Sequence, residues 1–90
     1  SSDLNVSILA KRQIADKLIV PKTAVLPRQG RKVVFVYENG RAIWKYVETG
    51  FENSREVCIE SGLKEGEEAI YENNLGLSHE CEVTLINKKE

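Results

Sequence analysis

At 90 residues the chain has room for one domain with a modest hydrophobic core. Its hydrophobic content of 41% and charged content of 30% exclude a disordered chain, and no apolar stretch approaches the roughly 20 residues of a membrane-spanning helix. The net charge is −1, but residues 1–45 hold nine Lys and Arg against three acidic residues, and residues 46–90 hold four against eleven. Because these charges alternate with apolar residues, they indicate solvated strand faces, and no nucleic acid partner is expected.

The first part of the chain alternates apolar and polar residues with a period of two, which predicts β-strands. Residues 4–8 form one such strand, and residues 17–21 form another. The second strand is expected to end at Pro21, because proline has no N–H to donate to a ladder. Residues 23–26 continue extended, and residues 27–30 interrupt them with Pro and Gly.

The strongest local signal is a hairpin. Two apolar-rich runs, Lys32–Glu38 and Arg41–Thr49, flank the pair Asn39-Gly40. Asn-Gly supplies the two positive-φ residues of a type I′ turn, whose twist suits a two-residue hairpin loop. Gly50 is expected to end the second strand.

The remaining segments continue the same pattern. A strand is expected at 55–60, with Val57 and Ile59 facing the core, and a turn follows at 61–66. A strand at 68–72 and a loop at 73–76 come next. A closing strand at 82–86 and a frayed tail at 87–90 complete the chain. The expected fold is all-β, a small antiparallel β-barrel or β-roll of about six to seven short strands with no substantial helix.

The sequence offers no set of catalytic residues. His79 is the single histidine, and no G-x-S-x-G nucleophile motif is present, so a catalytic triad has no basis. Glu80 and Glu82 are two residues apart and are expected on one solvated strand face. We therefore expect that the protein is not an enzyme and uses no catalytic residue and no cofactor.

The cysteines Cys58 and Cys81 lack the spacing of a zinc motif. Strand alternation places Cys58 outward, between Val57 and Ile59, and Cys81 inward with the core residues Val83 and Leu85. A disulfide is disfavoured, since its two Cβ vectors must converge. His79 and Cys81 share a face, so a soft metal ion bound there stays open as an alternative, although the expectation is that no metal binds.

Aromatic and basic side chains occur together in the second hairpin strand, as they do in sheets that bind single-stranded nucleic acid. They are Arg41, Trp44, Lys45 and Tyr46. The acidic neighbouring segments favour a role for the aromatic residues in the core or in a subunit contact instead.

Five short motifs follow one another at spacings that resemble one protein family. They are LIVPKTAV at 18–25, VVFV at 33–36 with Asn39-Gly40, VETG at 47–50, VCIESGLKEG at 57–66, and Leu77 followed by Val83. In this order they are similar to the C-terminal end of periplasmic adaptor proteins, also called membrane fusion proteins, of tripartite efflux pumps. Two positions depart from the family pattern: Glu67 stands where the family has Asp, and Glu80 stands where it has Gly.

The resemblance implies a division of the chain and a location in the cell. Residues 1–22 correspond to the last strand and connector of a β-barrel domain, and residues 23–90 to the membrane-proximal β domain. In the family this domain also receives a strand from the N-terminus of the protein, so an open sheet edge is expected. Family members are periplasmic and anchored to the inner membrane through parts outside this segment.

The implied function is that of an assembly domain. It docks the adaptor onto an inner-membrane transporter of the RND or ABC type, in a pump that includes an outer-membrane channel and a ring of adaptor copies. Candidate contact residues at hairpin and turn positions are Glu38, Asn39, Arg41, Trp44, Lys64 and Glu65. Two alternatives stay open: a small β-barrel module that binds a ligand or nucleic acid, and a metal-efflux adaptor with a site at His79 and Cys81.

Overall fold

The computed structural model describes residues 5–9, 13–14, 17–64 and 66–89. Its elements are β1 (Asn5–Leu9), β2 (Gln13–Ile14), β3 (Lys17–Pro21), the 3-10 helix η1 (Lys22–Ala24), β4 (Val25–Arg28), β5 (Arg31–Glu38), β6 (Arg41–Glu52), β7 (Glu56–Ser61), β8 (Glu68–Glu72), β9 (Cys81–Glu82) and β10 (Thr84–Lys89). The three residues of η1 are the one helical segment in the described ranges. The expected all-β fold without a substantial helix is confirmed.

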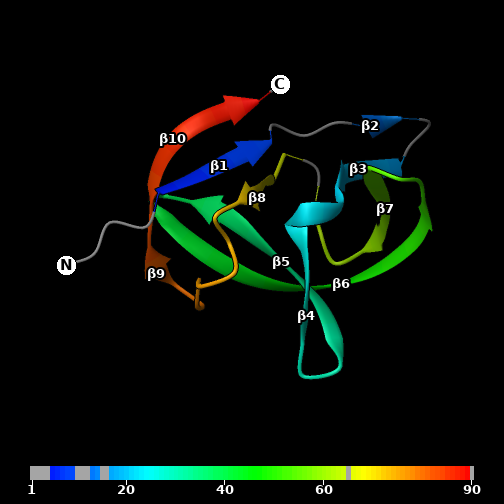
Figure 1. Cartoon of the computed structure of the whole chain (residues 1–90), viewed down its shortest axis with the longest axis horizontal. Coiled ribbons are helices and arrows are strands. Elements are labelled where there is room, and N and C mark those ends of the chain that lie inside the picture. Colours follow the sequence, from blue (N-terminus) through cyan, green and yellow to red (C-terminus); the bar gives the residue numbers. More distant parts are fainter. Residues whose placement is uncertain (1–4, 10–12, 15–16, 65, 90) are drawn as a thin grey trace.

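The strands form one strongly curled sheet. Its order is β10-β1-β8-β5-β6-β7-β3-β2, with β4 paired to β5 and β9 paired to β6. All described pairs are antiparallel except β1 with β10, which is parallel. The long strand β6 crosses the whole width of the molecule and links the half built on β5, β8 and β1 to the half built on β7 and β3 (Figure 1).

The hairpin of β5 and β6 has the predicted geometry. Asn39 has φ 51° and Gly40 has φ 80°, and Glu38 pairs directly with Arg41 across the turn. Both turn residues therefore occupy the left-handed region that a type I′ turn requires. The hairpin prediction is confirmed.

The core has two clusters, one on each face of β5. Val33 and Phe35 point into the first cluster, and Val34 points into the second. The first cluster holds Val6, Ile8, Leu26, Val33, Phe35, Ala42, Ile70, Leu77 and Val83. The second holds Val20, Ala24, Val34, Val47, Val57, Ile59 and Ala69. Because consecutive residues at 33–36 of β5 are all buried, this part of the strand is continuously apolar and does not alternate.

Strand β1 lies inside the sheet. It pairs with β10 on one side and with β8 on the other, and its Val6 and Ile8 are fully buried in the first cluster. β10 ends the strand order, so its outer edge has no partner among the described strands. That an N-terminal strand of the whole protein pairs with this domain stays a prediction. The division of the chain at residue 22 stays a prediction, although residues on both sides of it share one core here.

Two strand boundaries differ from the sequence predictions. Gly50 does not end the second hairpin strand, because β6 continues to Glu52 through a register irregularity between Thr49 and Glu52. A Cβ at Gly50 would meet the carboxylate end of the Glu60 side chain, which is flexible and can move aside. Pro27 does not interrupt the chain either: it lies within β4, and the turn falls at Gln29 and Gly30.

The C-terminal segment also differs. The single strand expected at 82–86 is divided at Val83 into β9, which pairs with β6, and β10, which pairs with β1. The division turns Leu85 away from the core, and 37% of its surface is exposed, so its expected burial is wrong. The expectation of a frayed tail is wrong for residues 87–89, which belong to β10 and pair with β1.

Candidate docking surface

Three candidate contact residues lie at the tip of the β5–β6 hairpin. Glu38, Asn39 and Arg41 are exposed there. The guanidinium of Arg41 lies 3.9 Å from a carboxylate oxygen of Glu82, and it also donates to the backbone carbonyl of Glu80 at 3.4 Å. The tip is therefore braced by β9 and by the turn before it, and its exposed side chains project from a fixed backbone.

Trp44 is half-buried and forms part of the core. Its ring meets Phe35 edge-on at 5.6 Å and Tyr46 at 5.8 Å between centroids. Its backbone N–H donates to Nδ1 of His79 at 3.1 Å. The ring packs against the first core cluster, so Trp44 offers only part of its surface to a partner.

The turn between β7 and β8 carries the next candidates. Lys64 is exposed, and its backbone N–H donates to Oε1 of Glu67 at 2.7 Å. Oε2 of Glu67 lies 3.4 Å from Nζ of Lys45 on β6. Glu67 thus caps this turn and ties it to the sheet. Glu65 lies outside the described residues.

The candidate residues fall into two separate groups. The β7–β8 turn passes beside residues 46 and 47 of β6, where a Cβ at Gly62 would collide with the carbonyl oxygen of Tyr46. Arg41, at the hairpin tip, is five residues earlier on the same strand, which at the usual strand rise is about 16 Å away. The hairpin group and the Lys64 group would contact different parts of a partner, or only one of them would be used.

The basic and aromatic set on β6 does not form an open nucleic-acid platform. Arg41 and Lys45 both have carboxylate neighbours, Glu82 and Glu67. Trp44 is packed on the core, so its faces are not free for base stacking.

His79 and Cys81 have structural contacts. Besides the bond from Trp44 to His79, the N–H of Ser78 donates to Sγ of Cys81 at 3.4 Å, and the N–H of Cys81 donates to the Ser78 carbonyl at 3.1 Å. Within the described ranges no three His, Cys, Asp or Glu side chains are grouped so that they could hold a metal ion. Cys81 packs against the first core cluster, as strand alternation predicted.

Cys58 corrects a prediction. It lies on the face of β7 opposite Val57 and Ile59, but it is 4% exposed and not open to solvent. Its thiol donates to Oε2 of Glu60 at 3.7 Å, and both Cys58 and Cys81 are free thiols. Cys58 contributes to the wall of a shallow groove of about 430 Å³ that Ile19 and the 79% exposed Phe51 also line. Strand parity placed the side chain on the correct face but did not reveal that neighbouring side chains cover it.

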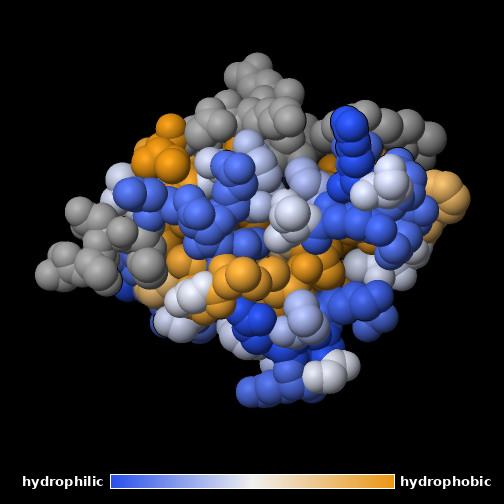
Figure 2. All heavy atoms as spheres, viewed as in Figure 1, coloured by the Kyte–Doolittle hydropathy of each residue, from blue (hydrophilic) through white to orange (hydrophobic). Residues whose placement is uncertain are grey.

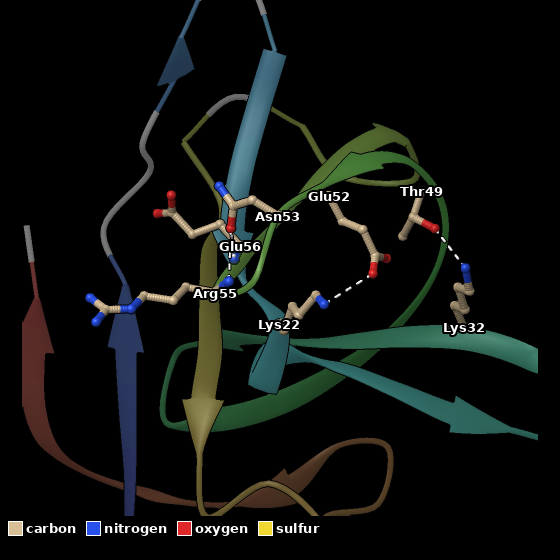
Figure 3. A network of polar contacts seen from close by, with 7 residues as sticks. All are labelled: Lys22, Lys32, Thr49, Glu52, Asn53, Arg55 and Glu56. Carbon is tan, nitrogen blue, oxygen red and sulfur yellow. Dashed lines mark hydrogen bonds and ion pairs between the residues drawn. The ribbon is translucent and has the colours of Figure 1, made fainter.

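A polar network fixes the turn between β6 and β7 (Figure 3). Oδ1 of Asn53 accepts the N–H groups of Arg55 at 2.8 Å and Glu56 at 2.7 Å, the pattern of an Asx turn. Lys22 of η1 reaches Glu52 at 3.0 Å, and Lys32 of β5 donates to Oγ1 of Thr49 at 2.7 Å. These contacts hold η1, β5 and the end of β6 together, and no sequence motif marks the residues that make them. Asn53, two residues before the start of the strand predicted at 55–60, is the sequence feature that could have indicated the β6–β7 turn, because Asn side chains commonly form Asx turns.

The curled sheet and its braced turns define a small all-β domain that offers exposed turn residues for contact with other molecules. A family model, the CzcB C-terminal circularly permuted SH3-like domain, matches residues 18–75, which is more than half of the chain. The chain belongs to this family, and it is a C-terminal domain of a CzcB-type membrane fusion, or periplasmic adaptor, protein. The resemblance deduced from the sequence motifs is thereby confirmed.

Adaptors of this type are periplasmic proteins of the cell envelope that act with transporter and channel partners. None of the curated proteins compared with the chain matches it. In the described part of the chain, no helix has the length and hydropathy needed to cross a membrane.

Proposed function

We propose that this domain docks a periplasmic adaptor onto the inner-membrane transporter of an export pump. The observation that carries the proposal is the family match over residues 18–75, which includes the β5–β6 hairpin and the β7–β8 turn. Both turns are exposed and are braced by side-chain contacts, so they present a fixed shape to a partner.

The proposed complex has further components. The transporter is of the RND or ABC type, the adaptor forms a ring of copies, and an outer-membrane channel completes the pump. The adaptor is anchored to the inner membrane by parts outside this domain and works in the periplasm. The domain contributes contact and carries out no turnover of its own. The use of His79 as a hydrogen-bond acceptor within the fold is consistent with that role.

Site-specific crosslinking in the full-length adaptor tests this proposal. A photoreactive residue at Asn39 or at Lys64, both exposed, is expected to crosslink to the transporter in intact cells. The same residue at Ser54, in the turn at the opposite end of β6, measures the background. Capture of cytosolic proteins alone from Asn39 and Lys64 would overturn the assignment.

A further inference from the structure

The hairpin that joins β4 to β5 is strongly basic. From Lys17 to Tyr37 the chain has five Lys and Arg residues and no Asp or Glu, and three of the five lie between positions 28 and 32. The hairpin projects from the body of the sheet at the bottom of Figure 1, and the same region is covered with hydrophilic side chains in Figure 2.

Two arginines stand directly opposite each other at the end of this hairpin. Arg28 of β4 pairs in register with Arg31 of β5, next to the turn at Gln29 and Gly30, so both side chains lie on the same face. Like charges placed directly opposite each other destabilise a strand pair. Among the described residues, neither arginine has a carboxylate within ion-pair distance. The fold therefore keeps two like charges opposite each other with no described carboxylate to offset their repulsion.

Both guanidinium groups are nevertheless held in place. Arg28 donates from Nη1 to the carbonyl of Pro27 at 2.9 Å and from Nη2 to the carbonyl of Leu75 at 2.8 Å. The guanidinium carbon of Arg31 lies 3.9 Å from the centre of the Tyr46 ring. Neutral oxygens and an aromatic ring fix the positions of the two groups but leave their positive charge without a counterion in the described part of the chain.

Exposed apolar surface adjoins the two arginines. Leu75 is 74% exposed, and Tyr46 is 39% exposed. We refer to Arg28, Arg31, Tyr46 and Leu75 as the arginine patch. Arg and Tyr are enriched in the residues that dominate binding energy at protein interfaces, where an apolar centre lies beside charged groups.

We propose that the arginine patch binds a folded protein surface that presents carboxylates beside an apolar spot. This inference rests on the proposed function: the surface that the patch binds belongs to the periplasmic region of the transporter. Charge complementarity requires an acidic partner, and the planar guanidinium groups suit carboxylates held in fixed positions. A lipid surface would be bound as well by mobile cations, and it would not need arginines that are fixed by carbonyls and a tyrosine ring.

Charge reversal of Arg31 in the full-length adaptor tests the inference. Arg31→Glu is expected to weaken binding to the purified transporter by roughly tenfold or more. Arg55→Glu is the matched control, because Arg55 is exposed and its side chain points away from the polar network in Figure 3. Arg55→Glu should leave the dissociation constant within about twofold of the wild type.

The same variant has a second readout that a structural defect would not produce. Arg31→Glu places a carboxylate opposite Arg28, so the isolated charge pair becomes an ion pair and the Tm should rise or stay unchanged. A fall in Tm that accounts for the loss of binding would overturn the inference.

The remaining outcomes separate the two proposals. If wild-type adaptor fails to bind the transporter, the proposed function fails. If the wild type binds and Arg31→Glu binds equally well, only the arginine patch is refuted.

Two further outcomes would assign the patch to another occupant. The first is that the wild type binds vesicles of equal phosphatidylglycerol and phosphatidylcholine and Arg31→Glu does not, while transporter binding is unchanged; the patch would then belong to the membrane. Self-association lost in Arg31→Glu, again with unchanged transporter binding, would assign it to a second copy of the chain. Either result overturns the inference.

Discussion

Gly62 lies where the β7–β8 turn passes closest to β6. Its φ is +106°, and an added Cβ would collide with the backbone of Tyr46 and lie 2.8 Å from Cα of Val47. Backbone atoms of a central strand cannot move aside cheaply. We expect Gly62→Ala to lower the free energy of unfolding by about 2–4 kcal/mol, as measured by urea denaturation.

Gly66 provides the matched control for this prediction. It also has a positive φ, +92°, but no atom lies within 4 Å of its added Cβ. Gly66→Ala should cost only the conformational strain, about 1 kcal/mol. Equal losses in the two variants would show that the close approach to β6 has no energetic weight.

Glu80 holds a backbone conformation that suits glycine. Its φ is +65°, in the left-handed region that glycine adopts without strain. The turn is retained because the N–H of Glu80 donates to the carbonyl of Ala42 at 2.7 Å, and this bond does not depend on the side chain. Glu80→Gly is expected to raise the free energy of unfolding by about 0.5–1 kcal/mol, because relief of the left-handed strain exceeds the added freedom of the unfolded chain.

Thermal unfolding of Glu80→Gly beside Glu82→Gly checks this prediction. Glu82 lies in β9, an extended strand, so glycine there should lower the Tm while glycine at position 80 raises it. A lower Tm in both variants would contradict the assignment of strain to Glu80.

At the scale of elements, His79 attaches the loop before β9 to strand β6. Its Nδ1 accepts the N–H of Trp44, which points away from β5 and would otherwise have no described partner. We expect His79→Ala to speed hydrogen exchange of the Trp44 amide by roughly fivefold, since one hydrogen bond is worth about 1 kcal/mol. NMR exchange rates measure this directly. The amide of Phe35, on the neighbouring strand, should keep its rate, and an unchanged rate at Trp44 would contradict the role of His79.

The elements that depend on local chemistry were predictable from the sequence. Asn39-Gly40 determines its turn through backbone conformation alone, and the strands at 17–21 and 68–72 have the predicted bounds. Predictions failed where a distant segment decides the outcome. Strand β6 extends past Gly50 because it pairs with β7 there. The segment at 82–86 is divided because β9 and β10 pair with different strands.

The candidate surface was predictable in part for the same reason. The tip residues Glu38, Asn39 and Arg41 follow from the hairpin, whose turn the sequence reveals. The arginine patch brings together positions far apart in the chain, with Arg28 bonded to the carbonyl of Leu75. The acid-free stretch from Lys17 to Tyr37 was the available signal, but it does not show which cations lack a partner.

At the scale of the whole molecule, β5 is the centre of the fold. Both of its faces are buried, and β6 carries the sheet from one core cluster to the other. This arrangement leaves turns and hairpin ends as the surfaces available for contact (Figure 1). Unfolding of the domain should therefore abolish contact through all of these turns and hairpin ends at once.

The most direct test of the central claim is the amount of transporter that co-purifies with the full-length adaptor from membranes. Adaptor with Gly62→Ala should capture less transporter than the wild type, in proportion to the fraction of this domain that limited proteolysis finds unfolded. Adaptor with Gly66→Ala should capture nearly the wild-type amount. The claim that this domain docks onto the transporter would be contradicted if adaptor with an unfolded Gly62→Ala domain captured as much transporter as the wild type.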